Sequence, residues 1–151
     1  MIRRAIPKDA AVLSRMALAA KAHWGYPERW MELWKPQLTF SPEYFENNES
    51  WVAEREHSPI AFYTLLDREE NAWIENLWVS PEDIGQGVGK KLFSHAVEVA
   101  RQRGYKRIQL EADPNAMGFY EKMGMRKIGE RHSAVEDQPR ILPLMELKLE
   151  H

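Results

Sequence analysis

The chain has 151 residues, of which 44% are hydrophobic and 29% charged, and its formal net charge is -2. This composition predicts a folded globular protein rather than a disordered one, and the balanced charge gives no indication of a nucleic-acid partner. The absence of cysteine excludes disulfides, thiolate metal sites and a cysteine nucleophile.

The first residues are not followed by the apolar segment of a secretion signal, and no apolar run reaches membrane-spanning length. We therefore expect a cytoplasmic protein without a membrane partner. No linker, repeat or low-complexity tract interrupts the chain, which predicts a single domain over residues 1–148. We interpret Leu149-Glu150-His151 as the remnant of an affinity tag.

The first third of the chain is predicted to be mostly helical. A short strand at residues 2–6 precedes Asp9, which we expect to be the N-cap of a helix with apolar residues at helical spacing. Residues 21–38 are predicted to bend at Gly25-Tyr26-Pro27 and to continue as a second helix. Ser41 followed by Pro42 predicts an N-cap and the first position of a short third helix.

Three strands, at residues 51–55, 60–66 and 72–79, are predicted to form an antiparallel meander. A helix from Gly87 to Gly104, a strand at 108–110 and a helix at 115–123 follow. Two strands at 125–130 and 141–147 end the chain, joined by a polar segment at 132–140 that is either a loop or a solvated hairpin. The expected fold class is α+β, with a mixed, mostly antiparallel central sheet flanked by about four helices.

A glycine-rich loop lies between the third meander strand and the long helix. In "SPEDIGQGVGKKLF" the glycines leave backbone N–H groups at the positive end of the helix dipole, which is typical of an anion site. The alternative is a tight turn that binds no ligand. The spacing does not match the dinucleotide motif GxGxxG, and Gly89 is followed by Lys90-Lys91-Leu92 rather than by the Lys-Ser/Thr of a P-loop.

Two longer segments are similar to one known family. "IENLWVSPEDIGQGVGKKLFSHAV" and "IQLEADPNAMGFYEKMGMRKIGE" resemble the GCN5-related N-acetyltransferase (GNAT) family over about the last two thirds of the chain. The order of strand, glycine loop, helix, strand and Asn–Tyr helix is also that of the family. The family loop usually carries Gln or Arg where this sequence has Ile84, and Met125 replaces an aromatic residue.

The resemblance implies a site for acetyl-CoA. Its pyrophosphate would bind the loop residues Gly85, Gln86, Gly87, Val88, Gly89 and Lys90. The strand Leu77-Trp78-Val79 would splay from its neighbour and pair with the pantetheine arm, to which Asn115 would also hydrogen-bond. Asn115 has the alternative role of a helix N-cap.

Acetyl transfer to an amine requires a base, because a free amine of pKa ~10 is mostly protonated at neutral pH. We expect Glu75 to be that base, since it has the strand parity of Leu77 and Val79; the alternative is a surface carboxylate or a partner for an arginine. Glu111 is the second candidate, with helix capping shared with Asp113 as its competing role. The resemblance implies that Tyr120 is the general acid near the cofactor sulfur; the alternative is a core tyrosine.

Acceptor specificity is expected to come from the first helices and from the segment before the last strand. His23, Trp24 and Tyr26, with Trp30 and Trp34, could form an aromatic wall for a cation or a flat ring. The alternative is that the tryptophans fill the core. Glu136, Asp137 and Arg140 are available to recognise a charged substrate, and no histidine–carboxylate spacing indicates a metal.

The sequence thus predicts an N-acetyltransferase that moves an acetyl group from acetyl-CoA to a primary amine of a small molecule or peptide. Direct attack in a ternary complex is expected, because no cysteine can carry the acetyl group. A non-catalytic acyl-CoA-binding sensor and a purely structural domain are the alternatives. A homodimer is compatible with the sequence, but no segment identifies an interface.

Overall fold

The computed structural model describes residues 1–150, and the predicted tag residue His151 lies outside that range. Contacts divide the chain into two compact units, Met1–Leu65 with Asn76–Leu92 and Leu66–Glu75 with Phe93–His151. The seven strands have the hydrogen-bonded order β1-β2-β3-β4-β5-β7-β6 and include both parallel and antiparallel pairs. The predicted α+β class with a mixed sheet is confirmed.

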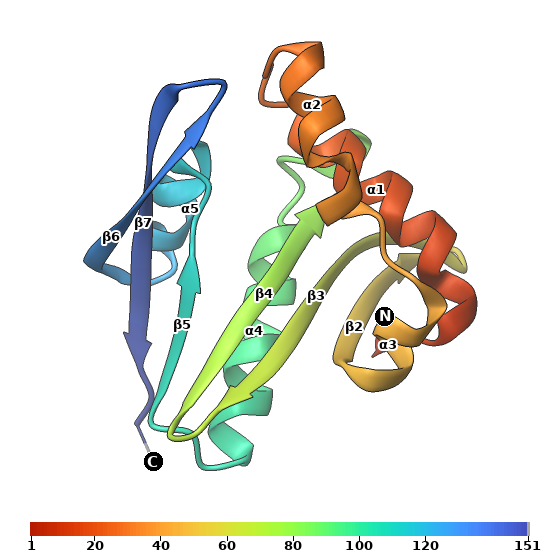
Figure 1. The fold of residues 1–151 in the computed structure, drawn as a ribbon. Coiled ribbons are helices and arrows are strands. Elements are labelled where there is room, and N and C mark those ends of the chain that lie inside the picture. Colours follow the sequence, from red (N-terminus) through yellow and green to blue (C-terminus); the bar gives the residue numbers. More distant parts are fainter. Residues whose placement is uncertain (151) are drawn as a thin grey trace. The chain divides into compact units, whose positions relative to one another are not determined.

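The helices and strands of the first unit begin with β1 (Ile2–Arg4), α1 (Ala10–Ala22), α2 (Glu28–Trp34) and α3 (Pro42–Asn47). β2 (Glu49–Arg55) pairs antiparallel with β1 on one side. On its other side it pairs antiparallel with β3 (Ser58–Arg68) (Figure 1). The end of β4 (Asn71–Val79), the 3-10 turn η3 (Pro81–Asp83) and the start of α4 (Val88–Gln102) complete this unit. The predicted meander strands are therefore present, each somewhat longer than expected.

The core of the first unit lies between β2, β3 and the first helices. Phe62 and Leu13 have no exposed surface, and Phe45 is 2% exposed. The side chains of Phe40, Phe45 and Phe62 are in tilted or edge-on contact, with centroids 5.7–6.1 Å apart. Burial of such aromatic side chains is a major stabilising contribution in a domain of this size.

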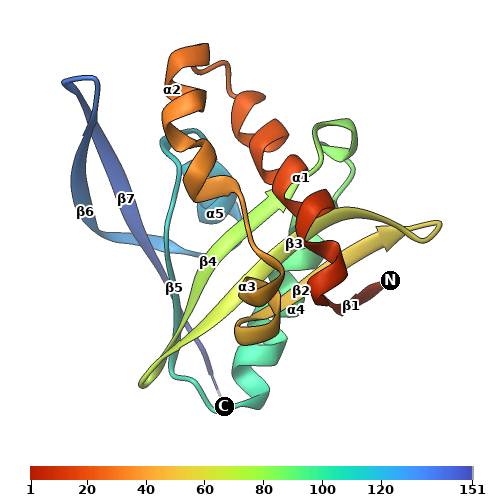
Figure 2. The ribbon, with the colours of Figure 1, turned by 45° about the vertical axis from the view of Figure 1, so that its right-hand side comes forward.

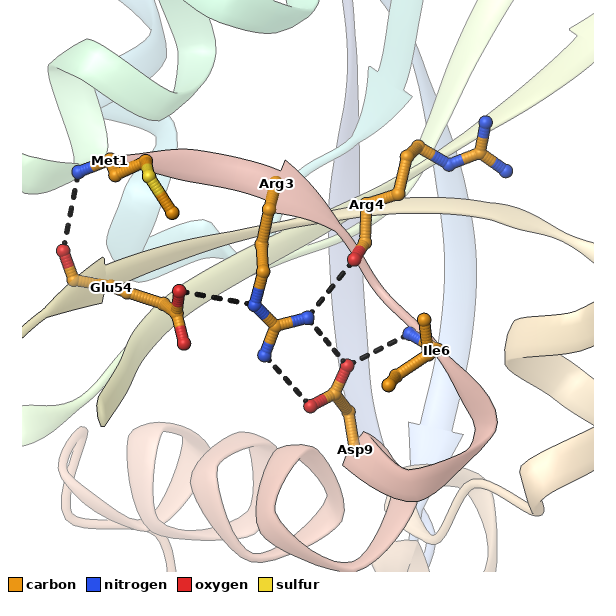
Figure 3. Close-up of polar contacts among 6 residues, drawn as sticks. All are labelled: Met1, Arg3, Arg4, Ile6, Asp9 and Glu54. Carbon is orange, nitrogen blue, oxygen red and sulfur yellow. Dashed lines mark hydrogen bonds and ion pairs between the residues drawn. The ribbon is translucent and has the colours of Figure 1, made fainter. Parts of the chain in front are cut away.

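The N-terminal strand is attached by an arginine with two acidic partners (Figure 3). Arg3 donates to both carboxylate oxygens of Asp9 at 2.9 Å, and its Nε lies 3.1 Å from Glu54 on β2. The Asp9 carboxylate also accepts from the N–H of Ile6 at 2.8 Å. Burial acts to raise the pKa of Asp9, but the hydrogen bonds from Arg3 and Ile6 outweigh it and hold that pKa below its usual range.

Asp9 occupies the N-cap position of α1, as predicted, but its side chain makes no cap hydrogen bond to that helix. Asp9 also ends the 3-10 turn η1 (Pro7–Asp9). Its oxygens point back to Arg3 and Ile6 instead, because a buried carboxylate is stabilised most by a charged partner. Ser41, in contrast, is the predicted N-cap: its Oγ accepts from the N–H of Tyr44 at 3.2 Å, and Pro42 is the first residue of α3.

The second unit contains the start of β4, most of α4, β5 (Arg107–Glu111), α5 (Met117–Lys122), β6 (Arg126–Val135) and β7 (Gln138–Lys148). β4 pairs parallel with β5 over Asn71–Ile74, and β7 lies antiparallel between β5 and β6. Ile108, Leu110, Phe93 and Met145 are at most 2% exposed and belong to its interior. Gly104 and Gly124, which were predicted to end helices, have φ of +80° and +98°.

The segment at 132–140 is a hairpin, not a loop (Figure 1). β6 and β7 pair continuously from Glu130–Pro143 to Val135–Gln138, and the turn consists of Glu136 and Asp137. Both turn residues have positive φ, 50° and 64°, as a two-residue type I′ turn requires. The predicted alternative, a solvated hairpin, is therefore the one observed.

No helix within residues 1–150 is long and apolar enough to cross a membrane.

Candidate functional site

The glycine loop connects η3 to α4 in the first unit (Figure 2). Gly85 and Gly87 have φ of +85° and +80°, a region that residues with a side chain rarely adopt. A Cβ built on either glycine would meet no atom within 4 Å. Glycine is needed here for the backbone conformation, and the space beside the loop is open to a ligand.

The first turn of α4 supplies hydrogen-bond donors next to this open space. The N–H of Lys91 donates to the carbonyl oxygen of Gly87 at 3.1 Å. The N–H groups of Val88, Gly89 and Lys90 precede that bond, so the helix itself gives them no acceptor. Together with the exposed side chain of Lys90 and the helix dipole, they fit the charge and the geometry of a phosphate.

The last residues of β4 are fixed by a buried hydrogen-bond chain. Asn76, which is 8% exposed, donates to Tyr44 Oη at 2.9 Å and to Thr64 Oγ1 at 3.3 Å. Its Oδ1 accepts from the indole N–H of Trp78 at 3.2 Å, and Thr64 Oγ1 lies 2.7 Å from Ser50 Oγ. Side chains of β2, β3 and α3 therefore fix the position of this end of β4 through hydrogen bonds.

Leu77, Trp78 and Val79 lie beyond the paired part of β4 and β5. The register of these two strands ends at Ile74–Leu110, although β4 continues to Val79. Leu77 and Val79 alternate with Asn76 and Trp78 along the strand, so they share the face of Glu75 as the sequence predicted. The proposed pairing of this segment with a pantetheine arm stays a prediction.

Tyr120 lies on α5 in the second unit and is 7% exposed. Its ring contacts Phe119 at 5.1 Å and Phe93 at 6.0 Å between centroids, both edge-on. Burial raises the pKa of Tyr120 well above its usual range, and the nearby negative charge of Asp113 raises it further. The phenol is therefore a hydrogen-bond donor that keeps its proton at neutral pH.

Asn115 lies in the 3-10 turn η4 (Pro114–Ala116) and not at the N-cap of a helix. The cap is Asp113, whose Oδ1 accepts from the N–H of Asn115 at 2.9 Å and from its Nδ2 at 3.0 Å. Asp113 also lies 3.6 Å from Arg140 Nη2. Arg140 is thus engaged with an acidic residue of its own unit, and its side chain is only 10% exposed.

The two carboxylates considered as the base lie on adjacent strands of the second unit. Glu75 is exposed on β4. Glu111 ends β5 and binds Arg131 of β6 through both oxygens, at 2.6 and 2.7 Å. Of the two residues considered for helix capping, Asp113 caps η4, whereas the carboxylate of Glu111 binds Arg131 instead.

The residues predicted to contact the acceptor lie at the turn between α1 and α2. Tyr26 stacks on Trp30 at 6.0 Å and meets Trp34 edge-on at 4.9 Å, while Lys21 Nζ lies 4.4 Å from the Trp34 ring centroid and 5.1 Å from that of Tyr26. Trp24 is 41% exposed, its neighbour His23 is also exposed, and α2 has no buried residue. Tyr26, Trp30 and Trp34 form one cluster that already holds the ammonium group of Lys21, and Trp34 also packs against the core of the first unit.

The structure thus places the predicted residues in two groups, one in each unit. The loop residues, Leu77 to Val79 and the aromatic cluster belong to the first unit, and Glu75, Asn115 and Tyr120 belong to the second. One residue at the loop was missed. Arg55, at the end of β2, contacts both Asp83 and Gln86. A single arginine before a turn gives no signal of that contact in the sequence.

A comparison with protein-family models matches residues 16–125 to the acetyltransferase (GNAT) family. Among curated relatives, a peptidyl-lysine N-acetyltransferase of Salmonella typhimurium, YjaB, is 35% identical over 98 residues, which are 64% of this chain and 62% of the relative. A putative ribosomal protein bS18-alanine N-acetyltransferase of Bacillus subtilis is 29% identical over 105 residues, 59% of this chain and 70% of the relative. The match to the Salmonella protein thus spans less than two thirds of that protein.

Solved structures share the fold over the whole chain. A GCN5-related N-acetyltransferase from Rhodopseudomonas palustris has a TM-score of 0.83 and 22% identity, covering 99% of this chain and 95% of the other. An N-acetyltransferase from Thermoplasma acidophilum in complex with coenzyme A has a TM-score of 0.77 and 21% identity, covering 98% of both chains. With the family match over residues 16–125, these comparisons lead to one conclusion: the chain belongs to the GNAT acetyltransferase family.

Proposed function

We propose that this protein is an N-acetyltransferase that takes its acetyl group from acetyl-CoA and transfers it to a primary amine. The observation that carries the proposal is the open glycine loop at the start of α4, where Gly85 and Gly87 have positive φ and no neighbouring atom fills the space of a Cβ. The residues that would bind the pyrophosphate are Gly85, Gln86, Gly87, Val88, Gly89 and Lys90. The complex of the Thermoplasma acidophilum relative with coenzyme A supports this donor.

The acceptor is proposed to be an amine because the names of the relatives specify amines of different molecules. They include a peptidyl lysine, an alanine of a ribosomal protein and glucosamine 6-phosphate. His23, Trp24 and Tyr26 are proposed to contact it. Lys21 Nζ, 4.4 Å from the Trp34 ring centroid, supports the view that these aromatic faces accommodate an ammonium group, for which a cationic acceptor would compete with Lys21.

The chemistry is proposed to be a direct transfer, with a C–N bond formed as the C–S bond breaks. Glu75 would take a proton from the ammonium group of the acceptor, directly or through water, so that the neutral amine can attack, and the N–H groups at Leu77–Val79 would polarise the acetyl carbonyl. Asn115 would orient the pantetheine arm through its amide.

Tyr120 is proposed to stabilise the leaving thiolate. The pKa of Tyr120 is raised well above the pKa of a thiol, about 8.5, so full proton transfer from the phenol to the thiolate is unfavourable. Tyr120 would therefore act mainly by donating a hydrogen bond to sulfur. Tyr120→Phe should therefore lower kcat by about 10²-fold or more, while the Kd for CoA changes little. An unchanged kcat would remove Tyr120 from the mechanism.

The experiment that tests the function is calorimetric titration of the full chain with acetyl-CoA and CoA, followed by thiol release with a panel of primary amines. Micromolar binding that is lost in Gly87→Glu, with turnover on at least one amine, is the expected result. Binding without turnover would favour the alternative, a non-catalytic acyl-CoA sensor. No binding of either compound would refute the proposal.

A further inference from the structure

One arginine from a different part of the chain contacts two residues of the glycine loop. Arg55 is the last residue of β2, where the hairpin to β3 turns (Figure 2). Its Nη1 forms an ion pair with Asp83 Oδ1, and its Nη2 donates to Gln86 Oε1 at 3.0 Å. The two nitrogens of one planar guanidinium therefore connect two loop residues that are three positions apart.

The two contacts lie at either end of the turn that contains the first glycine. Asp83 ends η3 and is 5% exposed, so its buried carboxylate requires a charged partner. Gln86 lies between Gly85 and Gly87, the residues with positive φ. The Gln86 Nε2 also lies 3.4 Å from the carbonyl oxygen of Glu82, so its side chain is held from both ends.

The start of the same loop is attached to the same hairpin. The N–H of Ser80 donates to the carbonyl oxygen of Ile60 on β3 at 2.8 Å. Between these attachments lies Ile84, which is 45% exposed and has no polar group to bind either an anion or the loop. Ile84 therefore adds no charge to that of Lys90 beside the loop, whereas the Arg55 side chain, 48% exposed, places a guanidinium there.

We propose that Arg55 is a positioning residue for the pyrophosphate of CoA: it fixes the glycine loop through Asp83 and Gln86 and places a guanidinium beside it, where Ile84 offers no polar side chain. This inference rests on the proposed binding of CoA at the loop. It differs from a merely structural role of Arg55, in which the arginine only neutralises the buried Asp83. A guanidinium is suited to the positioning role because a lysine ammonium cannot present the same rigid fork to two acceptors.

A double variant separates the two roles. Arg55→Met alone leaves the buried Asp83 carboxylate without its cation, which lowers stability whatever the function of the arginine. Arg55→Met with Asp83→Asn removes that unpaired charge, but the contact to Gln86 remains lost. The double variant is therefore expected to recover the melting temperature while still binding CoA at least tenfold more weakly than the wild type.

The measurement is the Kd for CoA by calorimetry, with the melting temperature of each ligand-free variant recorded alongside. Arg15→Met is the matched control for Arg55→Met, since Arg15 is an exposed arginine on α1 and its loss changes the net charge equally; the double variant keeps the wild-type net charge. The control should bind CoA within twofold of the wild type, and Arg55→Lys should bind with intermediate affinity. A double variant that binds CoA as tightly as the wild type would overturn the inference and leave the proposed function standing. A wild-type protein that does not bind CoA would overturn both.

Discussion

Replacing Gly87 by alanine tests whether the loop glycines are required for backbone conformation. At φ of +80°, an alanine adopts the left-handed backbone conformation, which is about 1–2 kcal/mol less favourable for a residue with a Cβ. No steric cost is added, because a Cβ at Gly87 meets nothing within 4 Å. The free energy of unfolding should therefore fall by about 1–2 kcal/mol.

Gly118 is the matched control for this change. It also has open space around a Cβ, but it lies in α5 and its φ is not positive. Alanine is favoured over glycine in helices, so Gly118→Ala should raise the stability by up to about 1 kcal/mol.

The assay is thermal unfolding of both variants beside the wild type, without ligand. For a chain of this size, 1 kcal/mol shifts the Tm by about 2–4 °C. Gly87→Ala should therefore lower the Tm by about 2–8 °C, and Gly118→Ala should leave it unchanged or raise it by up to about 4 °C. Equal Tm changes of the same sign in the two variants would refute the reasoning that backbone conformation decides the difference.

The other predictions concern stability in the first unit. Asp9→Asn should cost about 1.5–3 kcal/mol at pH 7 because it removes charged hydrogen bonds with Arg3. Since the pKa of Asp9 is lowered in the folded state, this contribution is complete above its unfolded pKa of about 4 and is lost as the pH falls through the folded value. Urea unfolding should show the gap between variant and wild type closing below about pH 4, and a pH-independent gap would contradict the ion pair. Ser41→Ala should cost about 1 kcal/mol through loss of its N-cap bond, and no change in the urea midpoint would exclude that role. Phe62→Ala should cost about 3–5 kcal/mol because its fully buried ring leaves a cavity, and a cost below about 1 kcal/mol would mean that the core around it collapses.

Local rules predicted the features that depend on neighbouring residues. The pair Ser41-Pro42 began α3 as expected, and Gly104 ended the long helix in the left-handed conformation. The spacing of apolar residues along the chain predicted the meander strands and α4. In each case the chemistry that fixes the element lies within a few residues of it.

Features without a local signature were missed or left open. The hairpin at 132–140 was predicted only as an alternative to a loop, because its turn Glu136-Asp137 lacks the Asn-Gly or Asp-Gly signature of positive φ. Asp9 was predicted at the N-cap of α1, which it occupies, but its side-chain bond to Arg3 could be recognised only once β1 was placed beside η1. Arg55 is similar, since the 31 residues between it and Gln86 conceal their contact.

The family resemblance predicted the loop and the order of the elements, but it did not specify what holds each side chain. Asn115 proved to be capped by Asp113, and Glu111 proved to be bound by Arg131. Those partners come from this chain's own sheet and hairpin. They decide which carboxylates and amides are available for chemistry, and only the structure gives them.

The position of β6 at the end of the strand order has a consequence for association. Its only neighbour in that order is β7, so its other side presents backbone donors and acceptors that another chain could pair with. Charged side chains are spaced along this strand at Arg126, Lys127, Glu130 and Arg131, all of them exposed. A strand from another molecule that paired with β6 would have to desolvate these charges. The charged side chains therefore protect β6 against edge-to-edge aggregation.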